Sequence, residues 1–402
     1  MQRLADVEAA SDGLGGTFSS FAEAKKAEQR WFKLRRYALQ AAAMRCLPSS
    51  HRLHKCLRAP LGSEVGIVHS PIDGSAHFRN VATCGSVWAC PVCAAKVSER
   101  RREELAKGLK KWRGDFGGAV WLVTLTFSHQ KHESLPMLLK GLSKAMKLFQ
   151  GGSAAKKDRE RFGIWGQVRA LEVTHGRNGW HPHIHMLVFL EAEDSHANRE
   201  RFRQTLFERW RRACDRAGLG TPTEKYGVKV DGYHRAGEYV TKWGVEHELT
   251  KQVTKEGRTA ESRTPLGILG DFLDTGDCED AALFGQFAAA FKGQRQLVWS
   301  RNMRAILGLG AEPTDEEVAA ADERQAGDVD LVSMPMKVWG LVVKHEVRGQ
   351  LLALAGLGDA EAVKRFLRAL PGAEGLEVAN DIAPGGTPRR LLEMWCEDVS
   401  AD

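Results

Sequence analysis

The stretch WGQVRALEVTHGRNGWHPHIHMLVFL, residues 165–190, predicts two strands joined by a tight turn. A strand pattern runs from Trp165 to Thr174, and the Asn178-Gly179 pair that follows is a strong signal for a two-residue hairpin turn. Residues 181–190 then form the returning strand. Two strands joined by so short a turn must be antiparallel neighbours in a sheet.

Three histidines, His181, His183 and His185, alternate along the returning strand. Because successive side chains point to opposite faces of a strand, all three imidazoles are expected on one face. A lone histidine on a strand is usually a hydrogen-bonded surface residue, but three in this alternation favour a metal site. Other metal-binding architectures remain open, although the HExxH motif of zinc proteases is absent from the sequence.

Glu172, on the first strand of the hairpin, is expected to be a third ligand. If the Asn-Gly pair forms the turn, Glu172 lies opposite His185, and a turn centred one residue earlier places it opposite His183. Both registers put the carboxylate on the histidine face. The alternative is a surface glutamate paired with a neighbouring arginine.

The flanking sequence predicts the order βαββαβ. Residues 119–127, AVWLVTLTF, form an apolar run typical of a strand buried on both faces. Ser134 can cap a helix, a second helix closes at Gly218, and a short strand follows at 228–230. We expect an α+β fold with an antiparallel sheet, two helices on one face, and the other face open for a ligand or a further helix.

A further helix is expected after Tyr233, with Arg235, Tyr239, Lys242 and Trp243 along one side. A metal on two imidazoles and one carboxylate could polarise a phosphate oxygen, and such a site needs a nucleophile. Tyr239 is the candidate, and Lys242 one turn away could help to deprotonate a phenol whose ordinary pKa is about 10. The alternative is that Tyr239 and Trp243 are only core residues.

Four of the eight cysteines gather before this region, and two of these four have the two-residue gap of a zinc knuckle. The other four are scattered, and a chain without an export signal is not expected to use disulfides. We expect a structural zinc here rather than buried free thiols, and a histidine could replace the first cysteine. The thiolates are Cys56, Cys84, Cys90 and Cys93, and the replacements for Cys56 are His54, His69 and His77.

The chain has 402 residues, a formal charge of +7 and an isoelectric point near 9.0, which favours an anionic partner. No signal sequence or apolar run long enough for a membrane span is present, so a cytoplasmic protein is expected. Basic residues cluster along a helix after the cysteines, and the alternative to DNA contact is a solvated helix face. The expected DNA contacts are Arg100, Arg101, Arg102, Lys110, Lys111 and Arg235.

Composition and periodicity divide the chain into four expected segments. Residues 1–50 form a helical accessory segment, and residues 51–117 hold the cysteines and a long helix. The sheet domain occupies residues 118–250. Residues 251–402 are expected to be mostly helical, and no catalytic pattern assigns them a role.

As a set, these residues resemble the replication initiators of rolling-circle plasmids and phages, members of the HUH endonuclease superfamily. The resemblance covers roughly residues 50–245 and rests on three motifs in order: VTLTFSH at 123–129, GWHPHIHMLV at 179–188 and EYVTKW at 238–243. The segment CGSVWACPVC at 84–93 is similar to one that precedes these motifs in one branch of the family.

The resemblance implies an HUH nicking domain with a ferredoxin- or RRM-like core, in which His183 and His185 bind Mg²⁺ or Mn²⁺ and Tyr239 is the nucleophile. Attack on single-stranded or extruded origin DNA would leave a 5′-phosphotyrosine and a free 3′-hydroxyl for a host polymerase. A host helicase and single-strand-binding protein are further implied partners, since the sequence has no GxxxxGK[ST] motif. Tyr233 is expected outside the helix, which indicates a single-tyrosine enzyme.

Two matters stay open from sequence. The base that ends the cycle could be Glu238 or Glu246, although Glu238 is also placed to pair with Lys242. A transposase or relaxase would use the same chemistry, and a zinc-containing nucleic-acid-binding protein would have no catalytic activity at all.

Overall fold

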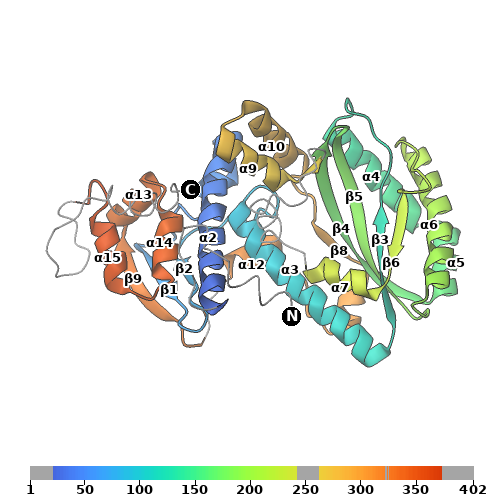
Figure 1. The fold of residues 1–402 in the computed structure, drawn as a ribbon, viewed down its shortest axis with the longest axis horizontal. Coiled ribbons are helices and arrows are strands. Elements are labelled where there is room, and N and C mark those ends of the chain that lie inside the picture. The colour runs from blue at the N-terminus through green and yellow to red at the C-terminus, as the bar shows by residue number, and fades with distance from the viewer. Residues whose placement is uncertain (1–20, 242–261, 322–323, 325, 374–402) are drawn as a thin grey trace. The chain divides into compact units, whose positions relative to one another are not determined.

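The computed structural model describes residues 21–241, 262–321, 324 and 326–373 (Figure 1). The chain divides into two compact units. The first combines Met1–Cys84 with Ala319–Asp402, and the second is Gly85–Val318. Within the described residues, no helix combines the length and the apolar character needed to cross a membrane.

A six-stranded sheet forms the centre of the described part of the second unit. Its main path runs β6-β3-β5-β4-β7 with every neighbouring pair antiparallel, and β8 also pairs with β4. The bounds are β3 Ala119–Leu125, β4 Ile164–Gly176, β5 Gly179–Leu190, β6 Val228–Asp231, β7 Ser262–Arg263 and β8 Leu297–Trp299. The predicted α+β class and antiparallel sheet are confirmed.

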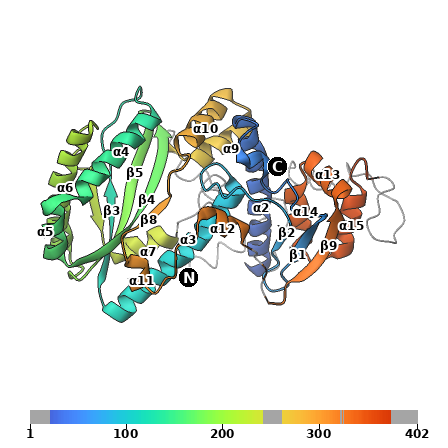
Figure 2. The same cartoon turned by 180° about the vertical axis from the view of Figure 1, so that it is seen from behind.

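One face of this sheet is covered by α4 Leu135–Gln150 and α6 His196–Ala217, with α5 Gly152–Phe162 following α4 (Figure 2). Leu138, Leu142, Met146 and Phe149 recur at helical spacing along α4, and all four are buried. α6 ends where Gly218 takes the left-handed conformation, at a φ of 79°. The predicted order βαββαβ holds, with α5 as an additional helix between the first two strands.

The opposite face carries α7 Tyr233–Thr241, which packs on β3, and α3 Pro91–Lys111, which packs on α7 (Figure 1). Apolar side chains of both helices join those of the sheet in one buried cluster. Trp112 follows α3 and donates a hydrogen bond from Nε1 to the carbonyl of Ala119, at 3.0 Å. Gly118 must remain a glycine, because a Cβ there would lie 2.5 Å from the Trp112 ring nitrogen.

The remaining described elements of the second unit are short. After α3, the chain makes one π-helical turn at Trp112–Phe116. A helix pair, α9 Pro265–Thr275 and α10 Cys278–Ala290, follows β7, and α11 Met303–Ile306 follows β8. The apolar residues between 283 and 291 belong mostly to α10. The helix α12 Asp315–Ala320 leads toward the C-terminal part of the chain.

The first unit brings together segments from both ends of the chain around a three-stranded antiparallel sheet, as far as it is described. The strand order is β2-β1-β9, and the long helix α2 packs on α14. The bounds are α2 Phe21–Cys46, η1 Arg52–Lys55, β1 Glu64–His69, β2 Ala76–Arg79, β9 Val329–Pro335, α13 Met336–Lys344, α14 Arg348–Ala355 and α15 Ala360–Arg368.

The two consecutive helices α13 and α14 are separated by a short break in the chain. The chain breaks at Glu346, whose φ of 56° lies in the left-handed region that cannot continue a right-handed helix. The following Arg348 is buried, and Nη1 donates to Gln40 Oε1 at 2.9 Å and to the carbonyl of Leu57 at 3.1 Å. The break therefore lets the buried Arg348 guanidinium donate hydrogen bonds to Gln40 and Leu57, which lie in two other segments of the unit.

Candidate active site

The hairpin of β4 and β5 sets the register of the site. Glu172 lies opposite His183, and Gly176 pairs with Gly179, so the turn consists of Arg177 and Asn178. The register that used Asn178-Gly179 as the turn is therefore wrong, and the alternative centred one residue earlier is confirmed. Gly179 is the first residue of β5, and its φ of 80° is one that glycine adopts without strain. The Asn-Gly pair therefore contains the last turn residue and the first strand residue, and not both turn residues.

Three side chains converge on the face that carries α7. The ligand atoms of Glu172, His183 and His185 all lie within 4.8 Å of one another, and this group could hold a metal ion. The distances from Glu172 Oε2 are 3.7 Å to His183 Nε2 and 3.5 Å to His185 Nε2. Two imidazoles and one carboxylate, each half-buried, form a donor set that suits a divalent ion and leaves coordination positions for a ligand.

Hydrogen bonds behind the imidazoles hold them in the orientation that ligation needs. Nδ1 of His183 lies 3.1 Å from the carbonyl oxygen of His181. Because a carbonyl can only accept, Nδ1 carries the hydrogen and Nε2 presents its lone pair to the site. Nδ1 of His185 lies 3.0 Å from Thr124 Oγ1 on β3, so that ring also turns Nε2 inward.

The carboxylate is held in its charged form. Burial alone would raise the pKa of Glu172, but the neighbouring imidazoles of His183 and His185 bring that pKa down to about 2. Burial lowers the pKa of His185, whereas the adjacent Glu172 carboxylate raises the pKa of His183 despite its burial. A charged carboxylate between two imidazoles is the arrangement that attracts a cation.

Tyr239 extends from α7 to this group. Its Oη donates a hydrogen bond to Glu172 Oε1 at 2.7 Å, and its ring centre lies 5.0 Å from that of His185. The helix is held over the sheet by Ala236 and Val240, which are buried in the core cluster. Burial and the adjacent Glu172 charge raise the pKa of Tyr239 well above its ordinary value, so the phenol is neutral in this state.

Other expectations for α7 have mixed outcomes. Lys242, Trp243 and Glu246 lie outside the described residues. Tyr233 was expected outside the helix, but it is the first residue of α7, and its ring lies under the Arg113 guanidinium at 4.2 Å. Glu238, expected to pair with Lys242, receives a hydrogen bond from Arg235 Nη1 at 2.7 Å.

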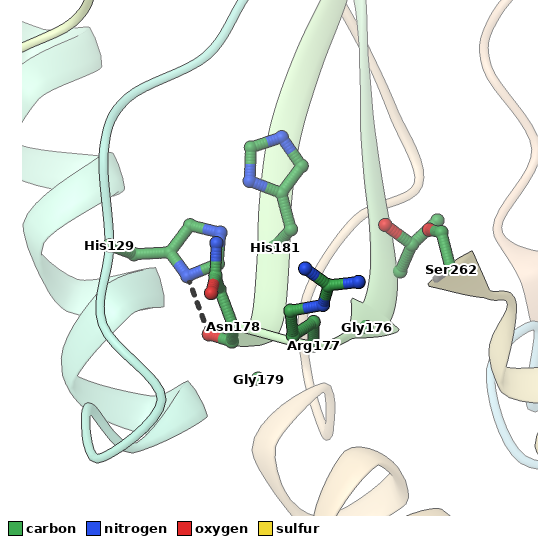
Figure 3. A pocket seen from close by; sticks show the side chains of 8 residues that line it. His129, Gly176, Arg177, Asn178, Gly179, His181 and Ser262 are labelled. Carbon is green, nitrogen blue, oxygen red and sulfur yellow. Dashed lines mark hydrogen bonds between the residues drawn. The ribbon is translucent and has the colours of Figure 1, made fainter. Parts of the chain in front are cut away.

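His181 is not part of the three-ligand group and lines a pocket at the hairpin tip (Figure 3). Its ring centre lies 5.3 Å from that of His183 and 4.8 Å from that of His129. His129 hydrogen-bonds through Nδ1 to the carbonyl of Asn178 at 2.9 Å, which ties the loop after β3 to the turn. His129 ends the first sequence motif, yet sequence analysis did not single it out as a site residue.

The cysteines predicted to bind zinc form a second group that could hold a metal ion. Cys90 is the N-cap of α3, and its Sγ accepts a hydrogen bond from the Cys93 amide at 3.4 Å. Four sulfur atoms are buried and lie within 4.8 Å of one another, as four thiolate ligands of one tetrahedral ion require. They are those of Cys56, Cys84, Cys90 and Cys93.

Five of the six basic residues proposed as DNA contacts keep side chains at least partly exposed. Arg102 pairs with Glu99 and Lys111 pairs with Asp115, one turn away on the same surface in each case. Such exposed pairs contribute little to stability, so the side chains can exchange one anionic partner for another. The five are Arg100, Arg102, Lys110, Lys111 and Arg235.

Arg101 does not fit the expected surface role. Its side chain is only 6% exposed and lies 3.3 Å from Glu104 and 3.4 Å from Asp315. Nη2 also donates to the carbonyl of Pro313 at 2.6 Å. Helical spacing places Arg101 on the buried side of α3, whereas Arg100 and Arg102 lie toward solvent. The Arg101 side chain therefore joins α3 to residues 313–315.

Comparison with known proteins gives three findings. A family model described as "Replication protein" matches residues 76–337. "Protein rep" of Streptomyces lividans is 27% identical over 329 residues, which cover 66% of this chain and 72% of that protein. "Neomycin resistance protein" of Streptomyces cyanogenus is 32% identical over 142 residues, covering 29% of this chain and 32% of that protein. No solved structure gives a significant match.

Proposed function

The chain belongs to the replication protein family, and from this premise we propose that it starts rolling-circle replication by nicking one strand of origin DNA with Tyr239. One observation carries the nicking activity. Tyr239 Oη lies 2.7 Å from a carboxylate whose other oxygen faces two imidazoles within 3.7 Å. The proposed nucleophile and the proposed metal ligands therefore lie together on the face of the sheet that carries α7.

A Mg²⁺ or Mn²⁺ ion bound by Glu172, His183 and His185 would polarise the phosphate and stabilise the charge that develops on it. Residues of the protein hold the imidazole rings and the phenol in place. Thr124 and the His181 carbonyl fix the two rings, and α7 holds the phenol beside them. Reacting groups held in place in this way lower the barrier by removing the entropy cost of bringing them together.

The proposed reaction exchanges one phosphate ester for another. The Tyr239 oxygen forms a bond to phosphorus, and the bond from phosphorus to the 3′ oxygen of the neighbouring nucleotide breaks. The phenol gives up one proton and the departing 3′ oxygen takes one up, so no oxidant, reductant or nucleotide cofactor is consumed. The products are a 5′-phosphotyrosine and the free 3′-hydroxyl that a host polymerase extends.

The protonated phenol of Tyr239, bonded to Glu172, defines a resting state of the proposed site. Its hydrogen bond to a charged Glu172 and its burial keep the phenol protonated. A cation brought close to the phenol would favour its ionised form. Lys242 remains the proposed assisting side chain, although its position lies outside the described residues.

The proposal is tested by incubating the full-length protein with single-stranded DNA from its own replicon in the presence of Mg²⁺ or Mn²⁺. Wild-type protein should form a covalent adduct, and Tyr239→Phe should keep metal and DNA binding while losing nicking, because only one oxygen is removed. Mass spectrometry should find the nucleotide on the peptide containing residues 237–240. Tyr226→Phe is the matched control, since Tyr226 is 64% exposed.

An active Tyr239→Phe protein, or a nucleotide attached to Tyr226 or Tyr233, would overturn the assignment of the nucleophile. A nucleic-acid-binding protein without catalysis would bind the same DNA and form no adduct. A transposase or relaxase would form the adduct but would not support copying of a plasmid that carries the origin, so a plasmid-maintenance assay separates these functions.

A further inference from the structure

Asp194 connects the first turn of α7 to two other elements of the sheet domain. It lies in the loop between β5 and α6, and its Oδ2 accepts the backbone N–H of Tyr233 at 3.1 Å. Oδ1 accepts Trp121 Nε1 from β3 at 2.9 Å and a hydrogen bond from Arg199 on α6. One carboxylate therefore links the helix that carries Tyr239 to a central strand and to a helix on the opposite face.

The chain around this carboxylate is closely packed. Gly232 precedes α7, and a Cβ at this position would lie 2.9 Å from Arg199 Nη1 and 3.0 Å from each Asp194 oxygen. Trp121 is fully buried and packs on Phe202, so its indole N–H is a fixed donor. The start of α7 therefore has one close-fitting position against Asp194.

α7 needs an anchor of this kind. The first amides of a helix have no acceptor within the helix, so each needs a partner from elsewhere, and Asp194 supplies one to the Tyr233 amide. Tyr239 follows Tyr233 by six residues, a rise of about 9 Å along the helix axis. A shift at the first turn is carried to the phenol, because the intervening backbone is hydrogen-bonded as a helix.

We propose that Asp194 is a positioning residue for Tyr239. It fixes the start of α7 so that the Tyr239 oxygen faces the phosphate when DNA occupies the site. This role rests on the proposed function, and it is separate from metal binding, since Asp194 is not among the three metal-ligand residues. It predicts a defect in the rate of cleavage rather than in the affinity for DNA.

The test compares Asp194→Ala and Asp194→Asn with Asp277→Ala. Asp277 is the matched control, because it caps α10 in the same unit through the Glu279 amide at 2.8 Å and does not contact α7. We expect Asp194→Ala to lower kcat about 100-fold, as a nucleophile misplaced by about 1 Å would, with KM and DNA affinity within a factor of two or so of the control. Asp194→Asn keeps one acceptor oxygen and should fall between the wild type and Asp194→Ala.

Two further measurements keep the outcome decisive. Gly232→Ala places a methyl group against the same carboxylate, so it should reproduce the kcat defect in a protein whose Asp194 is intact. Hydrogen exchange should show faster exchange of the Tyr233 amide in Asp194→Ala and no change there in Asp277→Ala. This second readout does not depend on DNA cleavage.

Equal kcat values for Asp194→Ala and Asp277→Ala would overturn the positioning role, as would an unchanged Tyr233 amide. A loss of DNA affinity as large as the loss of kcat would also overturn it, since that result indicates a general folding defect. A wild-type protein that forms no adduct would instead count against the proposed function, and the hydrogen exchange result would still report whether Asp194 holds α7.

Discussion

Glu172 makes two kinds of contact at once, with Tyr239 through one oxygen and with the imidazoles through the other. If Tyr239 is the nucleophile, its oxygen must turn from this carboxylate toward phosphorus before it can react. In that proposal, the resting hydrogen bond keeps the phenol close to the phosphate site but unreactive. A phosphate drawn to the metal ligands would compete for the same space and release Tyr239 only when DNA is present.

The first prediction concerns the two proposed metal histidines. His183→Ala or His185→Ala should abolish cleavage and leave the fold intact, because each removes one imidazole from a site that has only three proposed ligands. His181→Ala should be milder, since His181 lines the pocket at the hairpin tip and is not one of the three proposed ligands. The assay is cleavage after chelator treatment and readdition of Mg²⁺ or Mn²⁺. Full activity in the first two variants would reject this metal site.

A second prediction concerns the support of one ligand. Thr124→Val keeps the shape of the side chain but removes the hydroxyl 3.0 Å from His185 Nδ1. Losing such a support typically costs about 10- to 100-fold in metal affinity or activity, so cleavage should need more Mn²⁺ to reach the same rate. Thr126→Val is the control, because its hydroxyl donates to the Tyr226 carbonyl and not to a proposed ligand. Identical metal titrations for the two variants would contradict the prediction.

The sequence could predict that Glu172, His183 and His185 share one face of the sheet, but not the groups that support them. Alternation along a strand places His183 and His185 on one face wherever the strand begins, and a two-residue turn keeps Glu172 on that face in either register. Thr124 lies 61 residues before His185, and only the pairing of β3 with β5 brings them together. A contact of that kind depends on sheet topology, which no local spacing encodes.

At the scale of the elements, α3 packs on α7. Glu104 joins α3 to the segment after β8, where Arg304 lies. Its side chain is 5% exposed and lies 2.9 Å from Arg304 and 3.3 Å from Arg101. Burial would raise the pKa of Glu104, but these two guanidinium groups lower it. The paired carboxylate therefore stabilises the folded state in its charged form.

The third prediction follows from the sign of this shift. Because the folded-state pKa of Glu104 is depressed, its stabilising contribution is complete above the unfolded value of about 4.3 and is lost as the pH falls through the folded value. Glu104→Gln should lower the free energy of unfolding by about 3 kcal/mol at pH 7, and the difference from wild type should shrink in acid. Denaturant unfolding across this range measures it.

The control for this pair is Glu160→Gln, since Glu160 is 66% exposed and lies 3.9 Å from Lys156. An exposed pair of this kind contributes between zero and about 1 kcal/mol, so the variant should unfold like wild type. A Glu104→Gln difference that stayed constant with pH would show that lost packing, and not the charge, caused the destabilisation.

Element boundaries were predictable where a residue enforces them and less so elsewhere. Gly218 ends α6 as predicted because glycine adopts the left-handed conformation without strain. The hairpin turn moved by one residue because Arg177 and Asn178 occupy it and Gly179 opens β5. α7 begins at Tyr233, one residue earlier than expected, where a carboxylate 39 residues away in the sequence accepts the first amide.

At the scale of the whole molecule, the first unit draws on both ends of the chain, and its strand β9 pairs with β1 across more than two hundred residues of intervening sequence. Periodicity in each segment alone predicted an N-terminal helix and C-terminal helices. It could not predict that the two ends share one sheet, because β9 is short and has no hairpin partner beside it in the sequence.

The last prediction concerns the cysteine group, which we expect to affect folding rather than cleavage. Four buried thiols whose sulfur atoms lie within 4.8 Å are unfavourable neighbours if ionised, unless a cation neutralises them. We expect about one zinc ion per chain at this group, because a tetrahedral ion takes four thiolates and its binding free energy adds to folding. Cys90→Ser should therefore lose zinc together with solubility.

Elemental analysis after purification in metal-free buffer measures the zinc, and a thiol-modifying reagent should release it. Cys278→Ser is the matched control, since Cys278 is exposed and lies outside the group, so that variant should keep its zinc. His183→Ala should keep it as well, because the two proposed metal sites share no residue. Zinc-free protein with four freely titratable thiols in the folded state would reject the site, and its buried cysteines would then be ordinary core residues.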